Sequence, residues 1–413
     1  MKGLWTLADQ VLASLSNVLL TIVIAREASP DGLGAFGAAF AVYLIMTGVS
    51  RAVASEPLLV RFSAHDRQAG AAEHRAASRA SAGAALALGL AGLAALLAVS
   101  ALTGGTLGAV FAALAWSLPA LLVKDALRFV FLAAGRQSAA MAGDLTWVLA
   151  QVVTVGWVQA HGPRDVQWYV LAWGLSAAAG AVQGAFHARC PPSLARVPGW
   201  LRAHRDLLPG YVIDFAARSG GRQVTMLAVG WFGGLAALGA IRAAEVLFSA
   251  LNVVLQAGHL ATIPSAVAAH RRGRLRRAVL RLGVVLVGAS FLYGCGTLLV
   301  PPALGTALAG ETWELARPVL VAEIALYAGI AAVTAVTVGL RAAGDARRSA
   351  LVRVGVVPFS IAAGVAGALV AGAPGAVIGL AAVNWLALPV WIRQFRAVSS
   401  GSRDAAGAVP ASG

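Results

Sequence analysis

The sequence is poor in charged residues, and acidic residues are the scarcer kind. Asp, Glu, Lys and Arg make up 12% of the 413 residues, about half of the roughly 25% that is typical of soluble domains. The chain is 59% hydrophobic and its mean hydropathy is +0.79. So few charges cannot solvate the surface of such a chain, which excludes an ordinary soluble or disordered protein. A multi-spanning helical membrane protein remains.

Cysteine and catalytic motifs are also scarce. The two cysteines, Cys190 and Cys295, are predicted in a cytoplasmic loop and within a membrane span, so we expect no disulfide. The sequence has no Cys/His metal spacing, no GxxxxGK[ST] loop, no G-x-S-x-G elbow and no H-E-x-x-H motif. We therefore expect no metal, no cofactor and no ATP motor in this chain, and a protein that is not an enzyme.

Long apolar runs are abundant. A membrane helix needs about 20 mostly apolar residues, and twelve segments meet this condition. They are 4–25, 33–54, 82–102, 107–127, 139–160, 167–187, 209–230, 237–263, 279–300, 318–340, 351–371 and 375–395. The sequence predicts an all-α integral membrane protein with short connections.

The basic residues predict the orientation of these spans. With both termini in the cytoplasm, nearly all of the 32 Lys and Arg fall in cytoplasmic loops, including Lys124, Arg128 and the dense cluster 270–277. The exceptions are Arg26, Arg164 and Arg317 outside, and Arg218, Arg222 and Arg242 at membrane depth. This asymmetry follows the positive-inside rule. It explains the net charge of +15 without nucleic acid, and it predicts a multi-pass protein of a bacterial cytoplasmic membrane.

A weak internal repeat links the two halves of the chain. A shift of 205 residues brings Asp9 onto Asp214, Ser14 onto Ser219 and 33–35 onto 238–240. The shift equals six spans, so it predicts parallel six-helix halves related by a pseudo-two-fold axis along the membrane normal, with a cargo site between them. The expected parts are an N-terminal half at 1–190, a cytoplasmic linker at 191–208, a C-terminal half at 209–396 and a disordered cytoplasmic tail at 397–413.

Polar side chains recur at helical spacing in four spans. Ionisable groups at membrane depth are costly and usually face a bundle interior or an aqueous cavity. The candidates are Asp9 and Asn17 in the first span, Arg51 in the second, Asp214, Arg218 and Arg222 in the seventh, and Arg242, Glu245, Asn252 and Gln256 in the eighth. Steps of four place the seventh-span group on one helix face.

Two roles are predicted for these side chains. Arg218, Arg222 and Arg242 suit an anionic cargo, because the guanidinium fork binds phosphate oxygens in pairs. Asn17, Asn252 and Gln256 are candidate substrate contacts, although such residues often only hold membrane helices together. The carboxylates Asp9, Asp214 and Glu245 could bind a coupling H⁺ or Na⁺ or could simply pair with nearby Arg. Asp144 and Glu323 could form a second coupling site or lie at the interface.

The opening of the chain resembles a known family. The segment 25–36, Ala-Arg-Glu-Ala-Ser-Pro-Asp-Gly-Leu-Gly-Ala-Phe, is similar to the turn between the first two spans of polysaccharide flippases. These belong to the multidrug/oligosaccharidyl-lipid/polysaccharide exporter superfamily. The resemblance implies a flippase for a lipid-linked oligosaccharide in polysaccharide biosynthesis, working by alternating access. The head-group site would comprise Arg51, Arg218, Arg222 and Arg242.

Two other functions stay open. A cation-coupled multidrug exporter of the same superfamily would need an acidic, aromatic-rich cavity, whereas membrane-depth Arg is at least as abundant here as acid. A membrane scaffold for polysaccharide assembly proteins would transport nothing and would tolerate neutral replacements of the buried Arg. The expected partners are a lipid-linked glycan, membrane lipids and possible polysaccharide assembly proteins.

Overall fold

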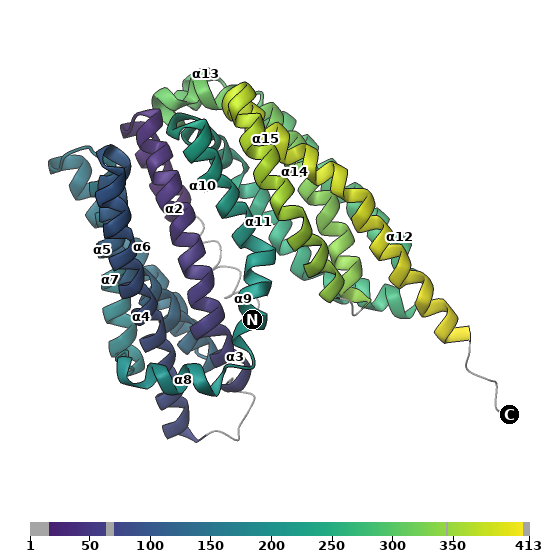
Figure 1. Ribbon diagram of the computed structural model, residues 1–413, viewed down its shortest axis with the longest axis horizontal. Helices are drawn as coiled ribbons and strands as arrows, with labels where there is room; N and C mark the ends of the chain where they lie inside the picture. The colour runs from purple at the N-terminus through teal and green to yellow at the C-terminus, as the bar shows by residue number, and fades with distance from the viewer. Residues whose placement is uncertain (1–15, 63–69, 344–345, 408–413) are drawn as a thin grey trace. The chain divides into compact units, whose positions relative to one another are not determined.

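The computed structural model describes residues 16–62, 70–343 and 346–407, and every regular element in these ranges is helical. Figure 1 shows the helices as long rods with short connections. Nine helical stretches in these ranges are long and apolar enough to cross a membrane. The expectation of an all-α protein built from membrane-spanning helices is confirmed.

The chain divides into two compact units, Met1–Gln223 and Val224–Gly413. The described part of unit 1 starts with a helical segment at 16–27. It continues through α2 (Pro30–Ser50), η1 (Arg51–Ser55), α3 (Glu56–Phe62), α4 (Ala71–Thr103), α5 (Gly105–Ala133), α6 (Gln137–His161), α7 (Val166–Ala188), η2 (Leu194–Arg196), α8 (Val197–Ala203), α9 (Leu208–Phe215) and η3 (Ala216–Gly220). The next helix, α10 (Gly221–Gly233), begins at the end of unit 1 and continues into unit 2.

The core of unit 1 forms around α5, which packs against α2, α4, α6 and α7. Trp173 of α7 is buried, and its ring lies 4.7 Å from that of Tyr43 and 6.0 Å from that of Phe40, both on α2. Such contacts between aromatic rings stabilise a core beyond the area that they bury. They fix α2 and α7 relative to each other.

The start of α2 shows how the sequence sets a helix boundary. Ser29 caps the helix, with its hydroxyl oxygen accepting a hydrogen bond from the Gly32 amide at 3.2 Å. Pro30 occupies the first turn and Asp31 supplies a negative charge there. These are the residue types that favour a helix N-terminus. The segment that resembles the flippase turn is therefore a well-formed helix start.

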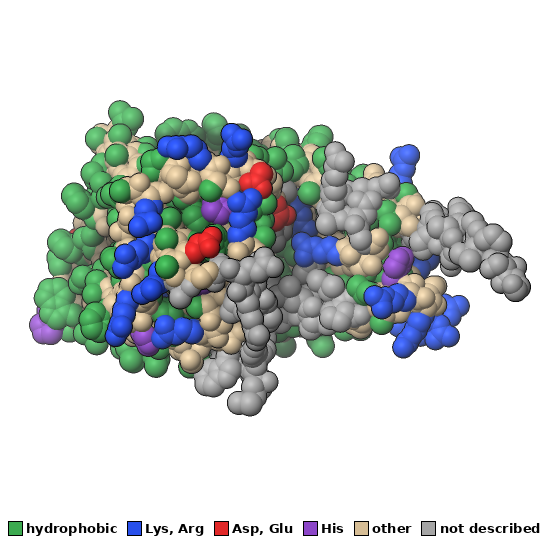
Figure 2. Space-filling model, turned by 90° about the horizontal axis from the view of Figure 1, so that it is seen from below, with side chains coloured by type: hydrophobic (Ala, Val, Ile, Leu, Met, Phe, Trp, Pro, Cys, Tyr) green, Lys and Arg blue, Asp and Glu red, His purple; other side chains and the backbone are tan. Residues whose placement is uncertain are grey.

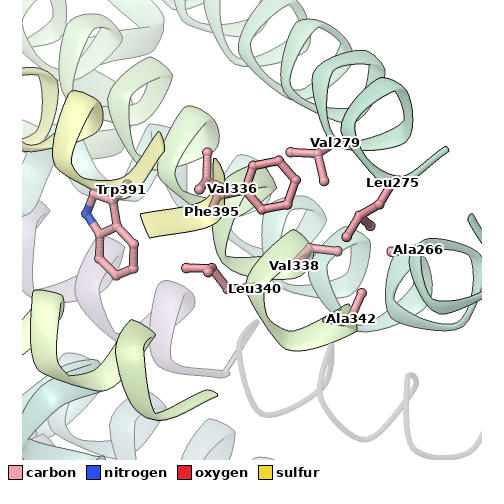
Figure 3. Packing of buried hydrophobic residues seen from close by; sticks show 9 residues of the cluster. All are labelled: Ala266, Leu275, Val279, Val336, Val338, Leu340, Ala342, Trp391 and Phe395. Carbon is pink, nitrogen blue, oxygen red and sulfur yellow. The ribbon is translucent and has the colours of Figure 1, made fainter. Parts of the chain in front are cut away.

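Unit 2 contains α11 (Leu235–Arg271), α12 (Leu275–Thr297), α13 (Pro302–Ala309), η4 (Gly310–Thr312), α14 (Trp313–Ala342) and α15 (Ala346–Gly407), with α14 packed against α11, α12 and α15. At one end these four helices share an apolar cluster. Figure 3 shows its members, which are Ala266, Leu275, Val279, Val336, Val338, Leu340, Ala342, Trp391 and Phe395. This cluster holds the ends of the four helices together.

The two last expected spans, 351–371 and 375–395, both lie in α15. The helix breaks at Ala371 and Gly372, and Gly372 has a φ of 60°, a backbone conformation that glycine adopts at little cost. On either side of the break the backbones come very close, since a Cβ on Gly379 would lie 2.1 Å from the Ala363 carbonyl oxygen. The GxxxG pair formed by Gly375 and Gly379 therefore packs one arm of a helical hairpin against the other.

The expected spans from 33–54 onward each overlap described helices. The first, 4–25, is described only from residue 16, where it is helical. The units divide inside the expected span 209–230. The expected linker 191–208 carries η2 and α8, and α15 extends to Gly407, into the segment 397–413 that we expected to be disordered. The pseudo-two-fold relation stays a prediction.

Candidate functional site

Arg51 lies where α2 changes into the π-helical turn η1. Such turns are rare and are frequent at functional sites. The guanidinium donates two hydrogen bonds to one carboxylate, from Nε to Asp125 Oδ2 at 2.8 Å and from Nη2 to Asp125 Oδ1 at 2.7 Å. It also lies over the ring of Phe129, 5.4 Å from the centroid. Arg51 is thus oriented by two residues of α5.

The two partners of this pair differ in exposure. The Arg51 side chain is 40% exposed, whereas that of Asp125 is 10% exposed. A guanidinium has five N–H donors, and Asp125 engages two of them. The carboxylate therefore holds Arg51 from the protein side, and the arginine keeps donors for a second, anionic partner.

A second charged group lies deeper in unit 1. Lys124 Nζ bonds Asp144 Oδ1 and sits 4.0 Å from the centroid of the Trp147 ring, and Arg128 Nε lies 3.3 Å from Asp144 Oδ2. Asp144 is fully buried, and the side chains of Lys124 and Arg128 are 9% and 13% exposed. One buried carboxylate thus offsets the charge of two cations in a low dielectric. We call Arg51, Lys124, Asp125, Arg128 and Asp144 the unit 1 charge cluster.

Most of this cluster was not predicted from the sequence. Lys124 and Arg128 were expected in a cytoplasmic loop, but α5 continues to Ala133 and holds both within the helix. Both residues thus lie in a helix and not in a loop, and both pair with Asp144 of α6; their cytoplasmic side stays a prediction. Asp144 is fully buried inside unit 1. A sequence signal existed: Asp144, Trp147 and Gln151 share one face of α6.

The linker packs against the π-helical turn. Trp200 of α8 donates its indole N–H to the Val53 carbonyl in η1 at 2.9 Å. Arg61 donates to the Ala203 carbonyl at 2.6 Å and to the Asp206 carboxylate at 2.7 Å. His204 is buried with its ring 3.9 Å from that of Trp200, and burial lowers its pKa below the ordinary 6.5. The linker helix thus supports the segment that begins with Arg51.

The start of the seventh span also packs against α2. Gly48 has no side chain, and the Phe215 ring fills the space, so a Cβ there would lie 1.9 Å from the ring carbon Cε2. Beyond Phe215 the helix forms a second π-helical turn, η3, at Ala216–Gly220. A π-helical turn holds more residues than an α-helical one. The spacing of four that was expected to align Asp214 with Arg222 therefore does not hold.

The remaining predicted site residues fall into three groups. Asp214, Arg222, Arg242 and Glu245 are half-buried, and Arg242 Nη1 lies 3.1 Å from Glu245 Oε2. Asn17 is half-buried, with no hydrogen-bond partner for its Oδ1 among the described residues, whereas Asn252 is exposed. Asp9 and the side chains of Arg218 and Gln256 lie outside the described residues. The structure thus pairs Arg51 and Arg242 with carboxylates of their own units.

No protein-family model and no curated protein sequence matches the chain. Solved structures do match it. An inward-facing multidrug resistance MATE family transporter of the MOP superfamily has a TM-score of 0.75 at 14% identity, over 95% of each chain. The lipid II flippase MurJ, in an inward closed conformation, has a TM-score of 0.65 at 10% identity, over 97% of this chain and 90% of that one.

A third solved structure differs in its binding pocket. It is a MOP superfamily transporter from Pyrococcus furiosus described as having a reversed pocket polarity, with a TM-score of 0.55 at 13% identity, over 96% of this chain and 94% of that one. At such identities these likenesses concern the fold. The proteins that share it here are transporters and a flippase and not enzymes.

Proposed function

We propose that this protein is a transporter of the multidrug/oligosaccharidyl-lipid/polysaccharide exporter superfamily. It moves a lipid-linked oligosaccharide or another anionic glycolipid across the bacterial cytoplasmic membrane by alternating access. The fold shared with transporters over 95% of the chain supports the general class, and the flippase-like start of α2 supports the branch. Fold alone does not determine cargo, so the cargo has to be argued from side chains.

The observation that carries the anionic cargo is the way in which Asp125 presents Arg51. Two of the five guanidinium donors are used by the carboxylate, and the side chain stays 40% exposed. A phosphate oxygen can take the remaining donors without breaking the pair. In a low-dielectric site such charge-assisted hydrogen bonds are about twice as strong as neutral ones.

In this mechanism the chain supplies binding and orientation. Arg51 binds the phosphate of the head group while Asp125 and Phe129 keep its fork in one orientation. The polyprenyl chain stays in the lipid, where it loses no apolar contact. Alternating access then exposes the head group to the other side of the membrane. Lys124, Asp144 and Arg128 are a candidate site for proton coupling, because a proton added to Asp144 would release two cations.

A cation-coupled multidrug exporter is the second candidate, and the likeness to MATE transporters favours it. The charge pairing argues against it. Asp125, Asp144 and Glu245 each pair with Arg or Lys, so these carboxylates attract a cationic compound weakly. A carboxylate that already accepts two donors has less capacity left than the Arg fork facing it.

The test is flipping in proteoliposomes with a fluorescent undecaprenyl-pyrophosphate-linked oligosaccharide and a membrane-impermeant quencher. Losing one charge-assisted hydrogen bond costs about 1.5–3 kcal/mol, or about ten- to a hundredfold in affinity. We expect Arg51→Gln to reduce flipping by at least about tenfold and Arg51→Lys to retain part of it.

Arg136→Gln is the matched control. Arg136 also lies over a phenylalanine ring, 5.5 Å from the Phe131 centroid, but it is exposed. Normal flipping by the Arg51→Gln variant would refute the anionic site. If the wild type exported ethidium and this variant did not, the drug exporter would be favoured. If a variant in which Arg51, Arg222 and Arg242 are all replaced by neutral residues kept an unchanged export phenotype, the scaffold function would be favoured.

A further inference from the structure

The corner between α11 and α12 carries a dense group of arginines. All six are exposed: Arg271, Arg272, Arg274, Arg276, Arg277 and Arg281. We call them the corner arginines. Figure 2 looks onto the end of unit 2 where this corner lies, and basic side chains far outnumber acidic ones on that face. This local positive charge needs a compensating negative charge.

The backbone fixes the corner in place. Gly273 adopts a φ of 67°, and the Arg274 amide donates to the Ala269 carbonyl at 2.8 Å, which ends α11 in a tight turn. Leu275 and Val279, which alternate with the arginines along α12, are buried in the apolar cluster of unit 2. The corner arginines are therefore presented on an ordered scaffold.

Neither α12 nor the part of α11 that follows Glu245 carries a carboxylate. The sequence contains no Asp or Glu between Glu245 and Glu311. Arg276 and Arg277 also lie in the first turn of α12, where the positive end of the helix dipole disfavours cations and favours anions. An external anion near this turn would be attracted by the side chains and by the helix terminus together.

The helix face next to the arginines is apolar and exposed. Leu280, Val284 and Val285 are 68%, 66% and 65% exposed. They lie within about one helical turn of Arg281, that is, within roughly 6 Å along the axis. A ligand that satisfies this surface needs an anionic group joined directly to apolar chains. A free phosphate, an acidic peptide or a nucleic acid would leave the apolar face uncovered.

We propose that the corner arginines bind the phosphodiester head groups of anionic glycerophospholipids, with the acyl chains lying along Leu280, Val284 and Val285. This lipid site is separate from the unit 1 charge cluster and does not depend on the proposed cargo. The affinity of this site for anionic lipids should fall as the salt concentration rises, because exposed charges are screened. Each basic side chain near an anionic membrane surface contributes about fivefold in affinity.

The test is native mass spectrometry of the detergent-purified full chain titrated with phosphatidylglycerol, cardiolipin or phosphatidylcholine. We expect the anionic lipids to be retained at least about tenfold better than phosphatidylcholine. The variant Arg276→Gln/Arg277→Gln/Arg281→Gln should abolish this preference, and Arg271→Gln/Arg272→Gln should reduce it. The two variants change different helices, so misfolding of one leaves the other informative.

The matched control is Arg196→Gln/Arg202→Gln/Arg205→Gln, which removes three exposed arginines from the linker, where Asp206 lies nearby. It should keep the preference. Equal retention of phosphatidylcholine, equal loss in the control, or an unchanged α12 variant would overturn the proposal. So would displacement of phosphatidylglycerol by equimolar undecaprenyl pyrophosphate, because the site would then belong to a pyrophosphate lipid.

Discussion

Asp144→Asn tests whether the interior of unit 1 depends on the charge cluster. The substitution keeps the shape of the side chain and removes its charge, so Lys124 and Arg128 face each other without the carboxylate that they share. Removing one partner of a buried ion pair costs about 3–5 kcal/mol, because the other charge stays buried and uncompensated. Here two cations lose the carboxylate that they share, so we expect a value within that range.

The same geometry predicts an order among variants. Lys124→Met leaves Asp144 with Arg128 at 3.3 Å, so it should cost less than Asp144→Asn, about 1.5–3 kcal/mol. The double variant should be more stable than the sum of the two losses predicts, by about 0.5–3 kcal/mol, because the residues are coupled. This order would not arise if the three side chains were independent.

The assay is thermal unfolding in nanodiscs, followed by tryptophan fluorescence. One kcal/mol shifts Tm by about 2–4 °C in units of this size, so Asp144→Asn should lower Tm by roughly 10 °C. The control is Asp206→Asn, since the Arg61–Asp206 pair is exposed at 37% and 56% and such pairs contribute about 0–1 kcal/mol. If the two Asp→Asn variants shift Tm equally, the reasoning is refuted.

Three further predictions concern other parts of the chain. The pKa of His204 lies below its ordinary 6.5, so protons bind the unfolded segment more tightly. Docking of α8 should therefore be stable above pH 6.5 and weaken below it, so the protection factors of residues 197–207, which correct for the intrinsic pH dependence of amide exchange, should be lower at pH 5.5 than at pH 7.5. Equal or higher protection factors at pH 5.5 would contradict this. Gly379→Ala should destabilise the protein by about 1–3 kcal/mol, because its Cβ would meet the Ala363 backbone. Gly355→Ala is the control and should leave the stability unchanged, because there is open space at that position in the same helix. Equal Tm values for the two variants would count against the hairpin packing. Arg222→Ala should insert and express but lose export, and wild-type export would remove Arg222 from the site.

Much of the fold could be predicted from the sequence because membrane spans have a local signal. An apolar run of about 20 residues is sufficient to mark a span, and Ser29 and Pro30 mark the start of α2. The spacing of Gly375 and Gly379 is likewise a local pattern that favours a close helix contact. Each of these features depends on neighbouring residues in the chain.

The charge cluster could not be predicted in the same way. A basic residue at the end of an apolar run normally marks a loop, and nothing next to Lys124 indicates otherwise. Its burial depends on Asp144, 20 residues away on another helix. The π-helical turns have no residue signature either, and η3 changes which face Arg222 presents. Partners on other helices decide these features, and a local pattern does not contain them.

The hairpin in α15 has a consequence for biosynthesis. The sequence contains no charged residue between Arg353 and Arg393, and the chain reverses within Ala371 and Gly372. Carrying this turn through the bilayer therefore moves no charge across the hydrocarbon, where each Asp, Lys or Arg would cost about 2.5–3.5 kcal/mol. The two arms can enter the membrane together as one preformed pair.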